Sequence, residues 1–175
     1  MIRSALFFLG LALALLVPLG LVIQKEHVLS TGQSVLLELA PRDPRSLMQG
    51  DYMVLDYDLT RNIQDDRALA PSSGLLVLKL DENGVGRFVR MDSPDIPLAP
   101  GEFKLRYRRR EGFIRLGAES FFFQEGHAER YERARYAELR MTSSGSSVLV
   151  GLRDANRQPM GGEPLPEATP PVPAP

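Results

Sequence analysis

The stretch APRDPRSLMQGDYMVLDY, residues 40–57, is the most informative part of this chain. Asp43 followed by Pro44 is a common pair at the start of a helix, and Gly50 readily takes the left-handed conformation that ends one. This pattern predicts a single helical or 3₁₀ turn over residues 45–49. The segment 52–57 that follows is rich in aromatic and apolar residues, which favours a strand.

Alternation along this strand assigns its side chains to two faces. One face carries Asp51, Met53, Leu55 and Tyr57, and the other carries Tyr52, Val54 and Asp56. Because both faces hold apolar or aromatic groups, we predict a central strand that is covered on both sides. Asp51 is expected at its entrance.

Most of the surrounding sequence also has the pattern of strands. Short apolar runs bounded by turn residues occur at 34–40, 74–80, 85–91, 102–109, 113–116, 137–142 and 148–153. Turn signals at 81–84, 111–112 and 143–145 join the last six runs into three hairpins. A helix is predicted at 127–136, where Glu129 with Arg133 and Glu132 with Arg135 have helical ion-pair spacing. The fold class is mainly β, or α+β, with antiparallel hairpins and one or two short helices.

The N-terminus carries the run ALFFLGLALALLVPLGLVI, residues 5–23, which contains no charge. A membrane-spanning helix needs about 20 apolar residues, whereas a cleaved signal peptide has a shorter apolar core and an A-x-A-like site. No such site follows the run. We therefore interpret residues 1–23 as a single transmembrane anchor, with a cleaved signal sequence as the alternative. Arg3 and the amino terminus favour an inside N-terminus and an outside domain.

The C-terminal segment 154–175 has seven prolines. This composition favours disorder or extended polyproline II structure, and a proline-rich ligand for a partner is the alternative. The region between the two ends, residues 24–153, is long enough to bury a core and is the predicted β-rich domain.

The composition excludes several classes of protein. The chain has no Cys, which removes disulfides, thiolate metal sites and a Cys nucleophile. Its 21 Lys and Arg nearly balance 22 Asp and Glu, so binding to nucleic acid by phosphate neutralisation is not expected. No cofactor is predicted.

Two blocks of sequence resemble the GDYXXLXY family. Gly50, Asp51, Tyr52, Leu55 and Tyr57 match its defining pattern, and Asp43, Pro44, Arg45 and Leu47 resemble the stretch before it. The segment 121–126, which ends in Glu125 and Gly126, resembles a second block. The resemblance implies a bacterial, membrane-anchored envelope protein of uncharacterised function, often encoded near multi-span membrane proteins. It implies no catalytic residue.

Several residues also allow a catalytic alternative. Ser46 precedes Gly50 and Asp51 somewhat as in type I signal peptidases, and Lys79 or Lys104 would serve as its base. Asp43, Asp51 and Glu125 would form a carboxylate or hard-cation site. Simpler roles are capping for Asp43, an ion pair with Arg42 or Arg45 for Asp51, and a turn for Glu125. His27 and His127 lack metal-ligand spacing, so no metal site is predicted.

A basic stripe lies in the predicted strand 102–109. Lys104, Arg106, Arg108 and Arg110 alternate with other residues and therefore share one face. Such a stripe fits anionic lipid headgroups, a phosphate-bearing glycan or an acidic partner. Ion pairing within the fold, or plain solvation, is the alternative.

These observations predict a non-enzymatic accessory module that is anchored in the inner membrane with its domain in the periplasm. It would act through contact with a multi-span membrane protein. The contrasting hypothesis is a membrane-tethered hydrolase that uses Ser46 or the carboxylates.

Overall fold

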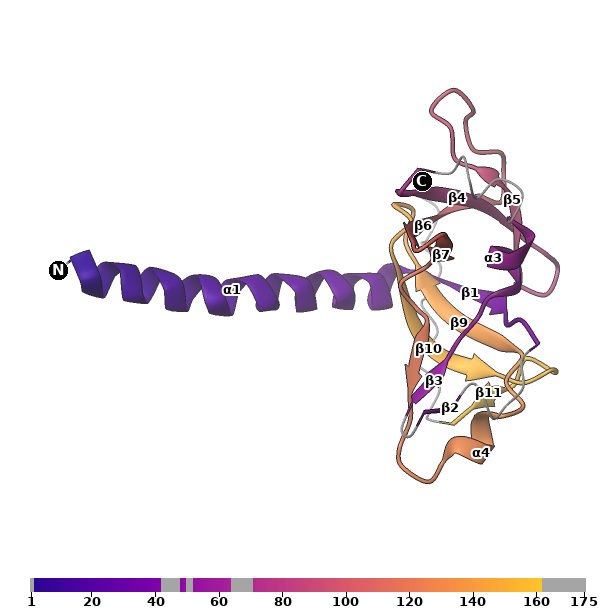
Figure 1. The fold of residues 1–175 in the computed structure, drawn as a ribbon. Helices are drawn as coiled ribbons and strands as arrows, with labels where there is room; N and C mark the ends of the chain where they lie inside the picture. Colours follow the sequence, from indigo (N-terminus) through magenta and orange to yellow (C-terminus); the bar gives the residue numbers. More distant parts are fainter. Residues whose placement is uncertain (1, 42–47, 50–51, 64–70, 162–175) are drawn as a thin grey trace, which may run out of the picture.

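The computed structural model describes residues 2–41, 48–49, 52–63 and 71–161. It begins with one long helix, α1 (Ile2–Thr31), which projects from a β domain and carries the N-terminus at its far end (Figure 1). The segment Phe7–Thr31 is long and apolar enough to cross a membrane. The side chains of Phe7 to Ile23 lie outside the domain, as expected for a helix whose surroundings are lipid.

The helix continues eight residues beyond the predicted end of the anchor at residue 23. Its last turn belongs to the folded domain, because Val28 is buried and the Val28 carbonyl accepts a hydrogen bond from the Gly32 N–H. The Arg140 guanidinium, itself buried, donates to the Gly32 carbonyl at 3.1 Å. The β domain is therefore attached directly to the end of the apolar helix.

Three antiparallel sheets form the domain. The first has the order β1-β9-β10-β11, with β1 (Gln33–Glu38), β9 (Tyr136–Met141), β10 (Ser147–Arg153) and β11 (Pro159–Met160). The second is β2-β3-β8, with β2 (Met48–Gln49), β3 (Tyr52–Val54) and β8 (Ser120–Phe122). The third is β5-β4-β6-β7, with β4 (Ser73–Leu80), β5 (Gly86–Met91), β6 (Glu102–Arg110) and β7 (Phe113–Arg115). The predicted β-rich fold class is confirmed.

The three predicted hairpins are all present as β4–β5, β6–β7 and β9–β10. Their turns have the chemistry that the sequence indicated. Asp81 accepts hydrogen bonds through its side chain from the N–H groups of Asn83 and Val85. Glu111 and Gly112 both have positive φ, 52° and 79°, as a tight two-residue hairpin turn requires.

One hydrophobic core connects the three sheets. It includes Leu37 and Leu139 from the first sheet, Met53 from the second, and Leu76 and Leu105 from the third, each at most 2% exposed. Because no sheet has a separate core, the domain is one folding unit.

The strand in the motif segment is shorter than predicted, but its alternation is correct. Met53, Leu55 and Tyr57 are buried, whereas Tyr52, Val54 and Asp56 are half-buried. β3 is the central strand of its sheet, with one face in the core and the other only partly covered.

Two helix predictions need correction. Met48–Gln49 form β2 and pair with β3, so the predicted turn over residues 45–49 is wrong at its C-terminal end, and residues 45–47 lie outside the described residues. The predicted helix 127–136 is only α4 (Ala128–Tyr131). The Arg135 N–H donates to the Arg153 carbonyl and Tyr136 begins β9. These sheet hydrogen bonds outweigh helical ion pairs, which contribute about 0.2–0.5 kcal/mol each.

The predicted disordered tail also begins too early. β11 pairs with β10 through Leu152↔Met160 and Arg153↔Pro159, so the fold continues past residue 153. The Asp154 carboxylate closes the connecting turn by accepting from the N–H groups of Asn156 and Gln158. Residues 162–175 lie outside the described residues. A further short helix, α3 (Asp58–Asn62), was not predicted and follows Tyr57 directly.

Candidate functional site: a basic cleft beside helix α1

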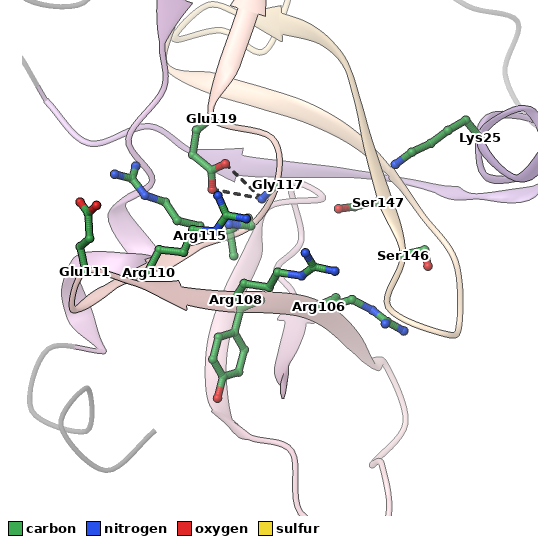
Figure 2. A pocket seen from close by; sticks show the side chains of 12 residues that line it. Lys25, Arg106, Arg108, Arg110, Glu111, Arg115, Gly117, Glu119, Ser146 and Ser147 are labelled. Atoms are coloured by element: carbon green, nitrogen blue, oxygen red, sulfur yellow. Dashed lines mark hydrogen bonds between the residues drawn. The ribbon is translucent and has the colours of Figure 1, made fainter. Parts of the chain in front are cut away.

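A cleft of about 660 Å³ lies where β6, β7 and the turn between β9 and β10 approach the end of α1. Its charged lining consists of Lys25, Arg106, Arg108, Arg110, Glu111, Arg115 and Glu119. The five cations outnumber the two carboxylates. Ser146 and Ser147 add hydroxyl groups on the side of the cleft that faces Lys25 (Figure 2).

Alternation along β6 explains why the arginines face the cleft. Leu105 and Tyr107 point into the core and are at most 2% exposed, so Arg106, Arg108 and Arg110 project from the opposite face. Within the described part of the chain, these three arginines form no ion pair. Their charge is therefore available to a ligand.

Lys104 departs from the predicted stripe. Its amine forms a 2.8 Å ion pair with Asp92, and it does not line the cleft. The alternative of internal ion pairing is thus correct for Lys104, while the other three cations of the stripe remain exposed.

The hairpin places two cations directly opposite each other. Arg108 of β6 pairs in register with Arg115 of β7. Side chains at such positions have Cβ atoms about 4.5–5.5 Å apart, and like charges there are destabilising. Arg115 lies near the ring of Phe113, with 5.9 Å from its Cζ to the ring centroid. An anion between the two guanidinium groups would relieve their repulsion.

Among the described residues, Glu119 forms no ion pair with either arginine. Its carboxylate accepts hydrogen bonds from the backbone N–H groups of Leu116 and Gly117, the latter at 3.1 Å (Figure 2). Gly117 has a φ of 79°, which only glycine adopts without strain, so the turn after β7 is closed by its own carboxylate. This turn forms one wall of the cleft.

The motif residues Leu55 and Tyr57 hold that wall in place. The Leu55 N–H donates to the Glu119 carbonyl at 2.8 Å, and the Tyr57 hydroxyl donates to the Ala118 carbonyl at 2.5 Å. Tyr57 is 1% exposed. Burial, together with the nearby Glu119 carboxylate, raises the pKa of the Tyr57 phenol well above its usual value, so the phenol remains a donor.

A glycine brings the other wall close to β6. The Arg106 N–H donates to the Gly145 carbonyl at 2.9 Å. A Cβ at Gly145 would lie 2.7 Å from Cδ2 of Leu75, and its φ is 83°. The turn between β9 and β10 therefore lies so close to the basic strand that a side chain at residue 145 would require Leu75 to move.

The remaining motif residues are placed as follows. Tyr52 packs its ring against Phe122 with centroids 5.7 Å apart. Glu125 and Gly126 form an exposed turn in which Gly126 has a φ of 80°, which agrees with the simpler role predicted for Glu125. Asp43, Pro44, Arg45, Gly50 and Asp51 lie outside the described residues.

The catalytic candidates do not come together in the described part of the chain. Ser46, Asp43 and Asp51 lie outside it, and Lys104 is held by Asp92. Lys79, His27 and His127 are exposed. Among the described residues, no cluster of three His, Asp or Glu side chains has the geometry to hold a metal ion.

A second depression, of about 640 Å³, lies between β3, α4 and the turn before β11. Its charged residues include both signs, with Asp56 and Asp154 beside arginines. It therefore has no clear preference for a charged ligand, in contrast to the basic cleft.

Sequence reasoning found three cations of the cleft and missed two. Arg115 was detectable, because a two-residue turn at Glu111 and Gly112 pairs residue 108 with 115. No pattern in the neighbouring sequence assigns Lys25, Glu119 or the two serines to the cleft. They reach the cleft only through the packing of α1 and of the turn between β9 and β10 against the third sheet.

A comparison with family models gives one match, to the family described as "GDYXXLXY protein", over residues 14–152. The match includes most of α1 and all strands from β1 to β9. Comparisons with curated proteins and with solved structures gave no match.

Proposed function

This chain belongs to the GDYXXLXY protein family, and from that premise we propose that it is a membrane-anchored accessory module of the bacterial envelope. Its helix would cross the inner membrane once and its β domain would lie in the periplasm. There it would contact a multi-span membrane protein. The family assignment and the apolar helix support the membrane anchor.

The attachment of the domain to the helix supports an anchor that is retained. α1 runs without interruption from the apolar segment into contacts with β9 and β10. A mass measurement of the protein from native membranes tests this directly. Full mass is expected, and loss of residues 1–23 would identify the helix as a cleaved signal sequence.

The loop between β5 and β6, residues 92–101, is the observation that carries the proposed protein contact. It projects from the domain away from the axis of α1 (Figure 1). Ile96 is 50% exposed and Leu98 is 40% exposed, with prolines on both sides of each. Loops that project from a rigid scaffold often carry binding residues, and these two aliphatic side chains are available for a contact.

The base of this loop is held by charged groups. Arg90 pairs with Glu102 at 3.2 Å, and the same carboxylate accepts from the Ala99 N–H at 3.0 Å. Lys104 pairs with Asp92 at the other side. These contacts order the backbone before binding, which lowers the entropy cost of association.

A site-specific crosslink tests the proposed contact. A photoreactive residue at Leu98 in the full chain, activated in native membranes, should capture a multi-span membrane protein. The matched control is the same residue at Glu82, which is exposed in the turn between β4 and β5. Capture at Leu98 should fall when Ile96→Asp is added. Equal capture from both positions, or none from Leu98, would refute the contact.

A further inference from the structure

We propose that the basic cleft binds the anionic headgroups of phospholipids in the same membrane that α1 crosses. This inference rests on a surface different from the 92–101 loop, so it fails or succeeds independently of the proposed protein contact. The ligand is the phosphate group of a lipid with net negative charge.

The position of Lys25 sets the level of the cleft relative to the membrane. The apolar run of α1 ends at Ile23, and Lys25 follows two residues later, about 3 Å further along the helix axis. Lysines at such positions extend toward the headgroup region. Because Lys25 also lines the cleft, the cleft lies at the same level as the headgroups.

The other cations meet the headgroups from the domain side. Arg106, Arg108, Arg110 and Arg115 come from strands that lie next to the end of α1 (Figures 1 and 2). Arginine recognises phosphate with a planar pair of donors, and its guanidinium is weakly hydrated compared with an ammonium group. Lys25 and the two serine hydroxyls supply further donors on the opposite wall.

The opposed arginines point to an anionic ligand independently of membrane position. Arg108 and Arg115 face each other across the hairpin, and Glu119 beside them is occupied by backbone N–H groups. The fold thus holds two like charges opposite each other, and neither forms an ion pair with a carboxylate of the described residues. A phosphate between them converts repulsion into two favourable contacts.

A lipid is a better fit than a soluble anion because the cleft is built partly from the membrane helix. A soluble phosphate would need no contribution from α1, whereas a headgroup is already at the level of Lys25. Headgroups are also highly concentrated beside an anchored domain. Contacts that each contribute modestly can therefore bind together.

Hydrogen exchange of the full chain in nanodiscs tests the proposal. Three conditions are compared: phosphatidylcholine alone, equal amounts of phosphatidylcholine and phosphatidylglycerol, and phosphatidylcholine with inorganic phosphate. Phosphatidylglycerol should slow exchange in peptides covering 110–119 and 142–147, which contain residues of the cleft lining. Peptides from α4, which lies away from the cleft (Figure 1), serve as an internal control.

Two pairs of substitutions locate the effect. Arg108→Gln with Arg115→Gln should abolish the slowing, and Arg115→Glu alone should do so as well. The control pair, Arg130→Gln with Arg133→Gln, removes the same amount of charge from exposed positions near α4. This variant should retain the slowing of exchange. The proposal is overturned if the wild type shows no slowing, if the cleft variants retain it, or if the control pair loses it. Equal slowing by inorganic phosphate would assign the cleft to a soluble anion.

Discussion

The hydroxyl of Tyr57 donates a 2.5 Å hydrogen bond to the carbonyl oxygen of Ala118, and this bond joins the family motif to the wall of the basic cleft. Leu55 reinforces the connection through its N–H, which donates to the carbonyl of Glu119. The two buried motif residues Leu55 and Tyr57 therefore act on the site from the core. They position the turn that contains Glu119 and do not face a ligand themselves.

Tyr57→Phe should lower the free energy of unfolding by about 1–3 kcal/mol, because the buried Ala118 carbonyl loses its hydroxyl donor. Urea unfolding of the full chain in detergent, followed by circular dichroism, measures the change. Tyr136→Phe is the control, since no hydrogen bond of the Tyr136 hydroxyl occurs in the described part of the chain, and it should change stability by less than about 0.5 kcal/mol. Equal effects of the two substitutions would contradict the role assigned to Tyr57.

Arg115→Glu should increase the stability of the isolated protein by about 0.2–1 kcal/mol, because it replaces a like-charge pair opposite Arg108 with an opposite-charge pair. The gain should shrink as salt concentration increases, since these groups are exposed. Thermal unfolding in a neutral detergent at low and high salt provides the measurement. A loss of stability at low salt would show that Arg115 has a structural role, and would weaken the case for a ligand site.

Glu138→Gln should lower the free energy of unfolding at neutral pH by about 1–3 kcal/mol, since Glu138 joins three strands. Its carboxylate accepts from Ser34 of β1 at 2.6 Å and from Arg153 of β10 at 2.8 Å. Glu82→Gln, at an exposed turn, is the matched control and should have little effect.

The same carboxylate predicts how stability changes in acid. Burial by itself would raise the pKa of Glu138, but the bonds from Arg153 and Ser34 outweigh it and hold the pKa below its usual value. The stabilisation is present above the unfolded-state pKa of about 4.3 and is lost as pH falls through the lower folded-state value. Glu138→Gln should therefore unfold with a weaker pH dependence across this range. An unchanged acid profile would exclude this contribution.

Gly145→Ala should destabilise the domain more than Gly84→Ala. Both glycines have positive φ, 83° and 76°, so an alanine at either position has a conformational cost of about 1–2 kcal/mol. Of the two, only Gly145 has atoms near the added Cβ, with Leu75 Cδ2 at 2.7 Å and the Arg106 backbone nitrogen at 3.3 Å, so the Leu75 side chain has to shift and the loss is larger. Paired urea unfolding curves compare the two variants. Equal losses would show that the turn between β9 and β10 can move away from β6 without cost.

Local sequence was sufficient for those parts of the fold whose cause is local. The hairpin turn at Glu111 and Gly112 was predictable because a two-residue turn requires positive φ, and a glycine between two apolar runs signals such a turn. The alternation around Met53 and Leu55 was predictable because successive strand residues face opposite sides. The helix predicted at 127–136 was shorter than its ion-pair spacing suggested, because Tyr136 is recruited into β9 by partners distant in sequence.

By itself, the sequence determined the apolar helix, the hairpins, and an outward row of arginines on β6, since these follow from composition and from the two-residue period of a strand. Only the tertiary structure decided which charges remain for a ligand. It paired Lys104 with Asp92, placed Arg115 opposite Arg108, and brought Lys25 from the apolar helix α1 to the same cleft. The physical reason is that a charge is neutralised by whatever lies within a few ångströms of it, and those neighbours come from strands and helices far apart in the chain.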